Sequence, residues 1–478
     1  MPASSATSAE SNHAEVSADP AKTRADAMRR DPRVAQAKRL LLEAIADHGG
    51  ALDDVRPPDP NHDEQHQRLL DRLSASRGGP PIWPYLSTGL GRGPYVELTD
   101  GSVKLDFIGG IGVHGAGHHH PDLTAAAIDA ALEDTVMQGN LQQHPPSIEF
   151  AERLIRWAGE SGATLDRCLI STSGAMANEN ALKLALHHKH PADRILAFDN
   201  AFAGRSLALA ALTDRPKYRM NLPLTVQVDY LPFRDPENVE RSTRWAVDEV
   251  RRLMDRHPNR YAAFWAEPIA GEGGYYPGSH DFFAAICGPI REAGVPIIFD
   301  EVQSFGRTSR PFAFQHYGLD EFADIVTVGK ITQACATLWS EPLHPSGPIL
   351  SQTFTGSSAS IATGIEMMRL MDVGGCFGTD GANMLRHRTF ARRLSELATE
   401  FPDRIRGPFG EGMMIAFTPD DGSFDAAKAM MDRMYEAGLL GFVCGSEPTR
   451  IRFLPPPVIT TEAHIDAAIQ ILRRVLSE

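Results

Sequence analysis

The sequence predicts an α/β fold, in which a mainly parallel sheet is sandwiched by helices, with a smaller α+β lobe beside it. Two observations predict this class. Strand-like and helix-like segments alternate through the middle of the chain, and the pattern changes to a mixture of helices and short strands near residue 371. With 478 residues, 42% hydrophobic and 23% charged, the chain has the composition of a globular protein and the length for more than one lobe.

The alternating segments begin near residue 167. Apolar, β-rich runs separated by runs of helical spacing are typical of a parallel sheet that helices cover on both faces. We expect the strands of this sheet at 167–172, 194–198, 262–266, 295–299 and 324–328. The helices are expected at 178–190, 245–257 and 281–293.

The smaller lobe follows a helix expected at 358–371. Helices at 384–400 and 424–437, strands at 412–417 and 450–454, and a final amphipathic helix through Ile465 and Leu472 give it an α+β pattern. We therefore divide the chain into four parts: a disordered or loosely packed extension at 1–80, an N-terminal segment of the small lobe at 81–115, a large domain at 116–371 and a small C-terminal domain at 372–478.

Charge and cysteine usage exclude several classes of protein. The chain has 47 Lys and Arg against 61 Asp and Glu, a net charge of -14, so we expect no nucleic-acid partner. The five cysteines are scattered and form no C-x-x-C motif, which favours a reducing compartment. No long apolar run and no signal-peptide pattern is present, so we expect a cytoplasmic protein that does not interact with a membrane.

Polar and aromatic residues follow the expected strands, where a parallel sheet binds its ligands. Ser173, Gly174 and Ala175 open a helix whose N-terminus can hold a phosphate. The other strands are followed by Phe202, by Glu267 and Glu272, by Asp300, and by Lys330. Each has an ordinary explanation when taken alone: a turn, a core ring, solvated acids, a helix cap and a surface lysine. Their convergence on one edge favours a shared site.

Together these residue types indicate a pyridoxal 5′-phosphate site. This cofactor needs an amine for a Schiff base, a carboxylate that keeps the pyridine nitrogen protonated, a stacking ring and an anion cradle. Lys330, Asp300 and Phe202 meet the first three needs, and the turn at 173–175 meets the fourth. Val302, two residues after Asp300, is expected against the face of the pyridine ring opposite Phe202.

From about Ile82 to the C-terminus, the sequence resembles the class III (ω-amino acid) aminotransferases of pyridoxal-phosphate fold type I. The resemblance is carried by Leu105–Val113, Ser173–Glu179, Phe202–Arg205, Glu267–Gly274, Ile298–Gln303, Gly329–Lys330, Thr353–Phe354 and Arg452–Pro455. It implies a seven-stranded sheet, pyridoxal 5′-phosphate as the cofactor and Lys330 as the catalytic residue. Ile331–Trp339 is similar to the lysine 6-aminotransferases, and Gly110–Val113 to the acetylornithine and 4-aminobutyrate aminotransferases.

The resemblance also implies roles for further residues. Gln303 would approach the phenolic oxygen of the cofactor, and Thr353 would reach the phosphate in a neighbouring subunit, which implies a homodimer with shared sites. For substrates, it implies that Arg205 grips a carboxylate and that Glu267 braces Arg205. Glu272 and Arg452 would form a switch: the Glu covers the Arg for an amine donor and leaves it for a 2-oxoacid. Ile111 would line the entry.

The activity so implied is transfer of an amino group from an ω-amino acid or diamine-type donor, such as lysine, ornithine or 4-aminobutyrate, to 2-oxoglutarate. Aminomutases, racemases and decarboxylases of the same fold remain alternatives. A nucleotide-binding oxidoreductase is a distant one, because Gly110–Gly115 spells G-x-G-x-x-G but no helix pattern follows it. The histidines at 118–120 and at 187, 188 and 190 lack an acid at ligand spacing, so we expect no metal site.

Overall fold

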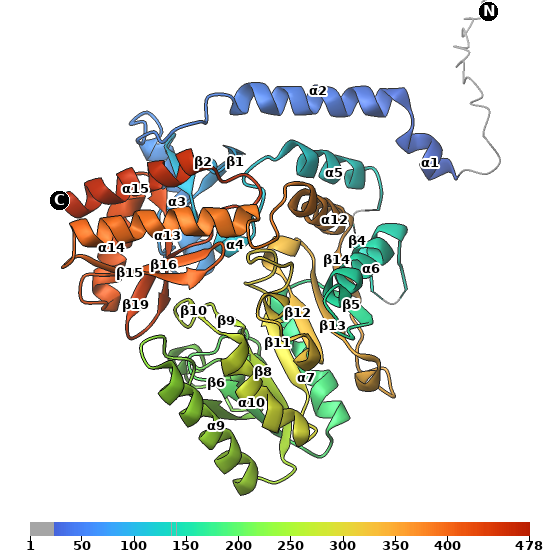
Figure 1. The fold of residues 1–478 in the computed structure, drawn as a ribbon. Coiled ribbons are helices and arrows are strands. Elements are labelled where there is room, and N and C mark those ends of the chain that lie inside the picture. The colour runs from blue at the N-terminus through green and yellow to red at the C-terminus, as the bar shows by residue number, and fades with distance from the viewer. Residues whose placement is uncertain (1–22, 135, 140) are drawn as a thin grey trace, which may run out of the picture. The chain divides into compact units, whose positions relative to one another are not determined.

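The computed structural model describes residues 23–134, 136–139 and 141–478 (Figure 1). Its contacts divide the chain into two units, Met1–Asp47 and His48–Glu478. The second unit contains the sheets and all of the expected site residues. In the part of the chain that the structure describes, no helix has the length and apolar character needed to cross a membrane.

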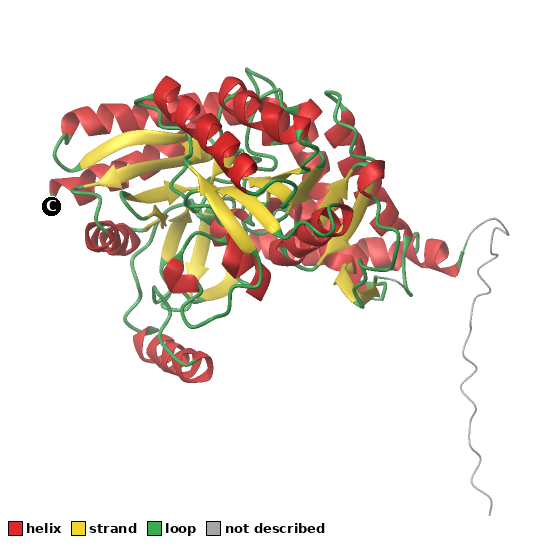
Figure 2. Ribbon diagram, turned by 90° about the horizontal axis from the view of Figure 1, so that it is seen from below, coloured by secondary structure: helices red, strands yellow, loops and turns green. Residues whose placement is uncertain are grey.

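A seven-stranded sheet forms the centre of the second unit (Figure 2). Its strands, in spatial order, are β5 (Arg167–Ser171), β13 (Cys335–Trp339), β12 (Ile325–Val328), β11 (Ile297–Glu301), β8 (Tyr261–Ala266), β6 (Arg194–Phe198) and β7 (Gln227–Leu231). All neighbours are parallel except β13, which runs antiparallel to both β12 and β5. The predicted α/β class and mainly parallel sheet are confirmed.

Helices cover both faces of this sheet because its strands are apolar on both sides. In β11, Ile297 and Phe299 join one core and Ile298 joins the other, as the alternation of side chains along a strand requires. The first core includes residues of α6 (Pro145–Gly159), α9 (Val239–Arg256), α10 (His280–Glu292) and α12 (Ser358–Val373). The second includes residues of α7 (Gly174–His188) and α8 (Leu207–Leu212).

The five predicted strands are present, but two members of the sheet were not predicted. They are β13, which returns antiparallel directly after the turn at Lys330, and the edge strand β7. The helix expected to begin at residue 178 begins at Gly174, because the Ser173 hydroxyl accepts a hydrogen bond from the Met176 N–H at 3.2 Å and caps the first turn.

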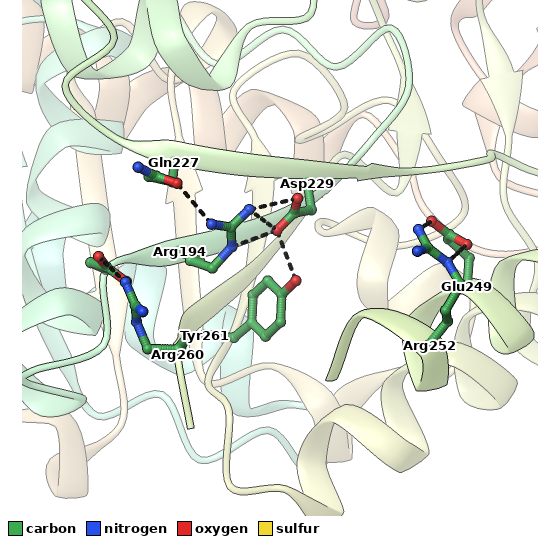
Figure 3. A network of polar contacts seen from close by, with 8 residues as sticks. Arg194, Gln227, Asp229, Glu249, Arg252, Arg260 and Tyr261 are labelled. Atoms are coloured by element: carbon green, nitrogen blue, oxygen red, sulfur yellow. Dashed lines mark hydrogen bonds and ion pairs between the residues drawn. The ribbon is translucent and has the colours of Figure 1, made fainter. Parts of the chain in front are cut away.

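A polar network joins β6, β7 and β8 at the edge of the sheet (Figure 3). Arg194 donates two hydrogen bonds of 2.8 Å to the Asp229 carboxylate, and the Tyr261 hydroxyl donates a third at 2.7 Å. Burial disfavours the charged carboxylate, but these donors outweigh it and lower the pKa of Asp229. The network lies where β6 and β8 begin, away from the carboxyl ends of the strands, so we assign it a structural role.

The C-terminal residues form an α+β layer, as expected. A sheet in the order β15 (Ile405–Glu411), β16 (Met414–Pro419), β19 (Thr449–Phe453) and β18 (Phe442–Gly445) packs against α13 (Ala382–Glu400), α14 (Phe424–Glu436) and α15 (Glu462–Ser477) (Figure 1). A second sheet combines β1 (Ser87–Arg92), β2 (Tyr95–Leu98) and β3 (Val103–Asp106) with β17 (Leu439–Leu440). The parallel pairing of β3 with β17 joins segments far apart in the sequence.

The part of the chain predicted as a disordered or loosely packed extension contains helices. Helices α1 (Arg24–Arg29), α2 (Pro32–Gly49) and α3 (Asp63–Arg77) precede Ile82, and residues 1–22 of the predicted extension lie outside the described residues. In the second unit, Leu52 and Leu70 are buried, and Arg56 bridges to Val103. Leu52 and Leu70 are isolated apolar residues in a segment rich in proline and charge. The sequence pattern therefore did not identify them as core residues. The division of the chain at residues 115 and 371 stays a prediction.

The remaining elements are short and connect the sheets. They comprise α4 (Gly109–Gly112), α5 (Pro121–Ala131), α11 (Ala313–His316), the pair β4 (Val136–Gln138) and β14 (Phe354–Ser357), the pair β9 (Ile269–Ala270) and β10 (Tyr276–Pro277), and the 3-10 turns η1 (Pro216–Tyr218), η2 (Asp320–Phe322), η3 (Lys330–Thr332) and η4 (Glu341–Leu343).

Candidate active site

Lys330 lies just beyond the carboxyl end of β12, in a left-handed backbone conformation with φ of 53°. Gly329 precedes it in an extended conformation, and a Cβ at Gly329 would come within 3.1 Å of a Val302 methyl. The burial of the Lys330 amine lowers its pKa to about 8, against the opposing effect of the Glu272 carboxylate. Lys330 is therefore much closer to the neutral, nucleophilic form at physiological pH than a free lysine is.

Asp300 provides a buried carboxylate near the end of the neighbouring strand β11. Its Oδ1 accepts a hydrogen bond of 2.9 Å from the Val302 N–H, and its Oδ2 accepts one of 2.7 Å from the Asn178 amide. Burial raises the pKa of Asp300 to about 6, and no Lys or Arg of the described residues forms an ion pair with it. A buried acid that lacks a cationic partner fits the protonated nitrogen of a pyridine ring.

Asn178 was not predicted as a site residue. Its side-chain amide donates to the Ala203 carbonyl at 2.7 Å as well as to Asp300, so both amide hydrogens are used and the amide is held in one orientation. Asn178 lies one turn beyond Gly174 in α7, on the helix face toward the sheet, and it is buried. The signal that could have identified Asn178 from the sequence is a polar residue at a helix position that faces the core.

The N-terminus of α7 lies next to Val302. A Cβ at Gly174 would come within 2.8 Å of a Val302 methyl, so only glycine fits here without displacing that side chain. The first N–H groups of a helix, which include those of Gly174 and Ala175, have no acceptor within the helix. Ser173, Gly174 and Ala175 therefore fit a phosphate. Val302 lies between this turn and the Lys330 turn, and its contact with the cofactor ring stays a prediction.

Glu267 connects two loops at the edge of the site. Its two carboxylate oxygens accept hydrogen bonds from the Phe202 N–H at 3.1 Å and from the Gly271 N–H at 2.9 Å. Burial, together with the nearby Asp300, raises the pKa of Glu267 to about 8. In this structure Glu267 thus holds the backbone that carries Phe202, whereas the resemblance implied that it braces Arg205.

Arg205 is exposed and packs on an aromatic ring instead. Its guanidinium carbon lies 3.9 Å from the centre of the Tyr218 ring. Phe202 meets the same ring edge-on, with the ring centres 6.5 Å apart. The guanidinium is therefore available to a carboxylate in the cavity that these residues line.

Arg452 and Glu272 form an ion pair, with the Arg452 Nη2 and the Glu272 Oε1 2.6 Å apart. Arg452 is fully buried in β19, and its Nη1 also donates to the Gln303 Oε1 at 3.2 Å. Burial disfavours the charged guanidinium, but Glu272 and neighbouring groups outweigh this and raise the pKa of Arg452. The pair is in the closed arrangement that the resemblance implied, and Gln303 contacts Arg452 within it.

A cavity of about 810 Å³ lies at this site. Its lining includes six of the predicted residues: Ile111, Phe202, Arg205, Glu272, Lys330 and Arg452. The predicted residues that do not line it include Ser173, Gly174, Ala175, Glu267, Asp300, Val302 and Gln303. Thr353 is not among the lining residues; it is exposed, and its carbonyl accepts a hydrogen bond from the Gly139 N–H. Its predicted contact requires a second subunit.

The structure argues against the nucleotide-binding alternative. Gly110 and Ile111 both have left-handed conformations in the four-residue helix α4, and the next helix begins only at Pro121. The long helix that opens directly at the glycine-rich turn of a dinucleotide site is therefore missing from this described segment. His118 bonds to the Asp106 carboxylate at 3.1 Å. Over residues 23–134, 136–139 and 141–478, no group of three or more His, Cys, Asp or Glu residues has a geometry that could hold a metal.

Comparison with known proteins identifies the family. The model of the class III aminotransferases matches residues 83–476. Acetylornithine aminotransferase from Methanocaldococcus jannaschii is 31% identical over 403 residues, which cover 81% of this chain and 92% of that protein. A LysW-aminoadipate semialdehyde transaminase from Deinococcus radiodurans is 30% identical over 392 residues, 81% of this chain and 85% of that one.

A solved structure shows the same fold. The lysine aminotransferase from M. tuberculosis, in its internal aldimine form, matches with a TM-score of 0.75 and 24% identity over 85% of this chain and 99% of that chain. The observed sheet and the flanking helices therefore correspond to pyridoxal-phosphate fold type I. The chain belongs to the class III aminotransferases, a family of pyridoxal-phosphate-dependent transaminases.

Proposed function

We propose that this enzyme moves the terminal amino group of an ω-amino acid or diamine-type donor to 2-oxoglutarate. The observation that carries the proposal is the closed pair of Glu272 and Arg452 in the cavity of Lys330. While Glu272 covers Arg452, Arg205 is the one arginine among the described lining residues that forms no ion pair, and its guanidinium is offered to the carboxylate of a donor whose amine points toward Lys330. The names of the two relatives, both of which concern amines at the end of a chain, support this donor class.

Each residue around Lys330 has a defined task in such a transfer. When bound, pyridoxal 5′-phosphate supplies the electron sink that stabilises negative charge on the substrate carbon. The Lys330 amine, whose pKa is about 8, takes the proton from that carbon and gives it back in a later step of the amino transfer. Asp300 would hold the pyridine N–H, Phe202 and Val302 would lie against the two faces of the ring, and the turn of Ser173, Gly174 and Ala175 would hold the phosphate.

The second half of the reaction needs the switch to open. A 2-oxoacid with two carboxylates, such as 2-oxoglutarate, replaces Glu272 on Arg452 and places its other carboxylate on Arg205. Arginine suits both positions because its planar guanidinium meets a carboxylate with two parallel hydrogen bonds. Glu272, whose side chain is partly exposed, has room to move toward solvent.

We further propose a cytoplasmic homodimer with shared sites. The exposed Thr353, which belongs to the cofactor-binding set implied by the family, supports a second subunit that completes the phosphate site. Sedimentation equilibrium tests this proposal. A mass near twice the 52.2 kDa of the chain is expected, and a monomer that is fully active would contradict it.

A donor panel tests the proposed activity. Lysine, ornithine, acetylornithine, 4-aminobutyrate and β-alanine are each supplied with 2-oxoglutarate, and glutamate is measured. We expect at least one ω-amine donor to yield glutamate in a one-to-one ratio with the carbonyl product. Conversion of a donor without stoichiometric glutamate would contradict transfer and favour an aminomutase, a racemase or a decarboxylase.

Arg452→Ala separates the two half-reactions. We expect the KM for 2-oxoglutarate to rise far more than the KM for the donor, because only the acceptor binds this guanidinium. Arg386→Ala is a matched control, since Arg386 is a partly buried arginine that bonds to the Pro457 carbonyl and does not line the cavity. Equal effects on both KM values would contradict the switch.

A further inference from the structure

Arg307 is a fully buried arginine beside the active site that takes no part in the proposed transfer. No Asp or Glu of the described residues forms an ion pair with it, and burial lowers the pKa of its guanidinium to about 10, which leaves it charged at neutral pH. A buried charge without a counter-ion destabilises a protein unless hydrogen bonds compensate for the lost water. The hydrogen bonds of Arg307 therefore indicate what an arginine does at this position.

The Arg307 guanidinium connects two segments of the chain. Its Nε donates a hydrogen bond of 3.0 Å to the carbonyl of Gln303, four residues earlier in the sequence. Its Nη2 donates one of 2.5 Å to the carbonyl of Gly112, which is 195 residues away. A Cβ at Gly112 would come within 2.5 Å of the same Nη2, so the contact leaves no space for a larger residue.

The bond to Gly112 holds one end of a strained turn that lines the cavity. Ile111, the residue before Gly112, lines the cavity and has a left-handed conformation with φ of 62°. A β-branched side chain strongly disfavours this conformation, which persists only where the surrounding contacts fix it. The Asp106 carboxylate fixes the start of the turn by accepting two backbone N–H groups, and Arg307 fixes its end.

The bond to Gln303 reaches another wall of the cavity. The side-chain Oε1 of Gln303 accepts a hydrogen bond of 3.2 Å from Arg452, the arginine of the switch. Arg307 thus holds the backbone of a residue whose side chain holds Arg452. Because this contact does not involve Glu272, it can keep the Arg452 guanidinium in place when Glu272 moves away.

The backbone around Arg307 is fixed independently of the Arg307 side chain. The Arg307 carbonyl accepts a hydrogen bond of 2.8 Å from the Met413 N–H. The Asn383 side chain donates to the carbonyls of both neighbours, Gly306 and Thr308, at 3.0 Å each. These bonds remain when the side chain of Arg307 is changed, so we expect variants at this position to fold.

We propose that Arg307 is a positioning residue of the active site, which holds the Ile111 turn on one wall of the cavity and Gln303 with Arg452 on another. The spacing between these walls is then fixed, and the substrate meets Ile111 and Arg452 in a constant geometry. Arg307 is not among the residues that line the cavity, so it acts through these partners. This inference rests on the proposed function, because the acceptor carboxylate is assigned to Arg452.

Arg307→Met tests the proposal, because it removes both hydrogen bonds and keeps an apolar side chain of similar length. We expect the KM values for 2-oxoglutarate and for the best donor of the panel each to rise about tenfold, as the loss of a hydrogen bond to a charged group gives. A merely structural role would lower the amount of active enzyme, and hence the apparent kcat, and would leave both KM values unchanged. Arg307→Lys keeps the charge, but one ammonium cannot replace the planar guanidinium on two carbonyls, so a smaller rise is expected.

Hydrogen exchange of the turn gives a readout that needs no substrate. The N–H groups of residues 112–114 donate to carbonyls within the turn. In Arg307→Met holoenzyme these amides should exchange about tenfold faster than in the wild type. Arg386→Met is the control, since Arg386 is a partly buried arginine that also bonds to a backbone carbonyl, that of Pro457, and does not line the cavity. It should change neither the exchange of the turn nor the KM values.

The two readouts separate the possible failures. Unchanged exchange of the turn in both Arg307 variants, or unchanged KM values in variants whose exchange is faster, would overturn the inference. If Arg307→Met does not fold, Arg307→Lys decides by the same two criteria. If 2-oxoglutarate supports no turnover by the wild-type enzyme, the proposed function fails, and the exchange measurement alone decides whether Arg307 positions the turn.

Discussion

Replacing Glu272 by Gln removes the charge that covers Arg452 and keeps the shape of the side chain. The two charged groups lie 2.6 Å apart, Arg452 is fully buried, and the Glu272 side chain is 22% exposed. In the proposed switch an incoming 2-oxoacid must displace this carboxylate from the guanidinium. The strength of the ion pair therefore sets how much acceptor affinity is lost to the competition.

The burial of the two groups bounds the magnitude. Breaking a fully buried ion pair costs about 3–5 kcal/mol, and an exposed pair contributes about 0–1 kcal/mol. Because one partner is buried and the other is partly exposed, we take about 2 kcal/mol for this pair. Since about 1.4 kcal/mol corresponds to a factor of ten, Glu272→Gln is expected to lower the KM for 2-oxoglutarate by roughly thirtyfold.

Steady-state kinetics with one substrate varied at a time measure this change. The kcat/KM for the amine donor should fall in the same variant, because the uncovered Arg452 repels a donor ammonium. Glu149→Gln is the control: it breaks a surface pair with Arg153, whose charged atoms are 3.1 Å apart, and it should change neither parameter. An unchanged or higher KM for 2-oxoglutarate in Glu272→Gln would refute the competition between Glu272 and the acceptor.

Three further predictions concern the cofactor site. The pKa of Lys330 is lowered to about 8, and only the neutral amine reacts. The rate at which the cofactor-free protein takes up pyridoxal 5′-phosphate should therefore rise with pH and level off above about 8. A rise centred near 10.4, as for a free lysine, would contradict the burial of the amine. Asn178→Ala should weaken cofactor binding by about tenfold in a fluorescence titration, since a hydrogen bond to a charged group is lost, whereas Asn180→Ala, which loses a bond to a serine, should not. Gly174→Ala would bring a Cβ to 2.8 Å from a Val302 methyl and should also weaken cofactor binding. Gly288→Ala is the control, because the added Cβ meets open space there. Equal weakening in both variants would contradict this steric cause.

The sheet and the centre of the site could be predicted from sequence because both depend on local patterns. Apolar runs buried on both faces identified the strands, and the residue after each strand is placed at the carboxyl edge by the parallel arrangement itself. Asp300, Phe202 and Lys330 were found in this way. The antiparallel strand β13 was not predicted, because a five-residue, mostly apolar run after a turn specifies no direction.

The partners of the site residues could not be predicted, because they depend on loops that meet in three dimensions. Glu267 accepts hydrogen bonds from two backbone N–H groups, whereas a contact with Arg205 was expected. The sequence around Glu267 does not distinguish a backbone partner from an arginine partner. Asn178 looks like an ordinary helix residue until the distance to Asp300 is known. Thr353 depends on a second subunit, so its contact stays a prediction.

Chemical trapping of the cofactor tests the central assignment most directly. Borohydride converts a lysine–cofactor double bond into a stable secondary amine, and peptide mass mapping then locates the modified side chain. We predict that the whole label is found on Lys330 and that Lys330→Ala protein carries none. Label on a different lysine, or full transaminase turnover in Lys330→Ala, would contradict the account.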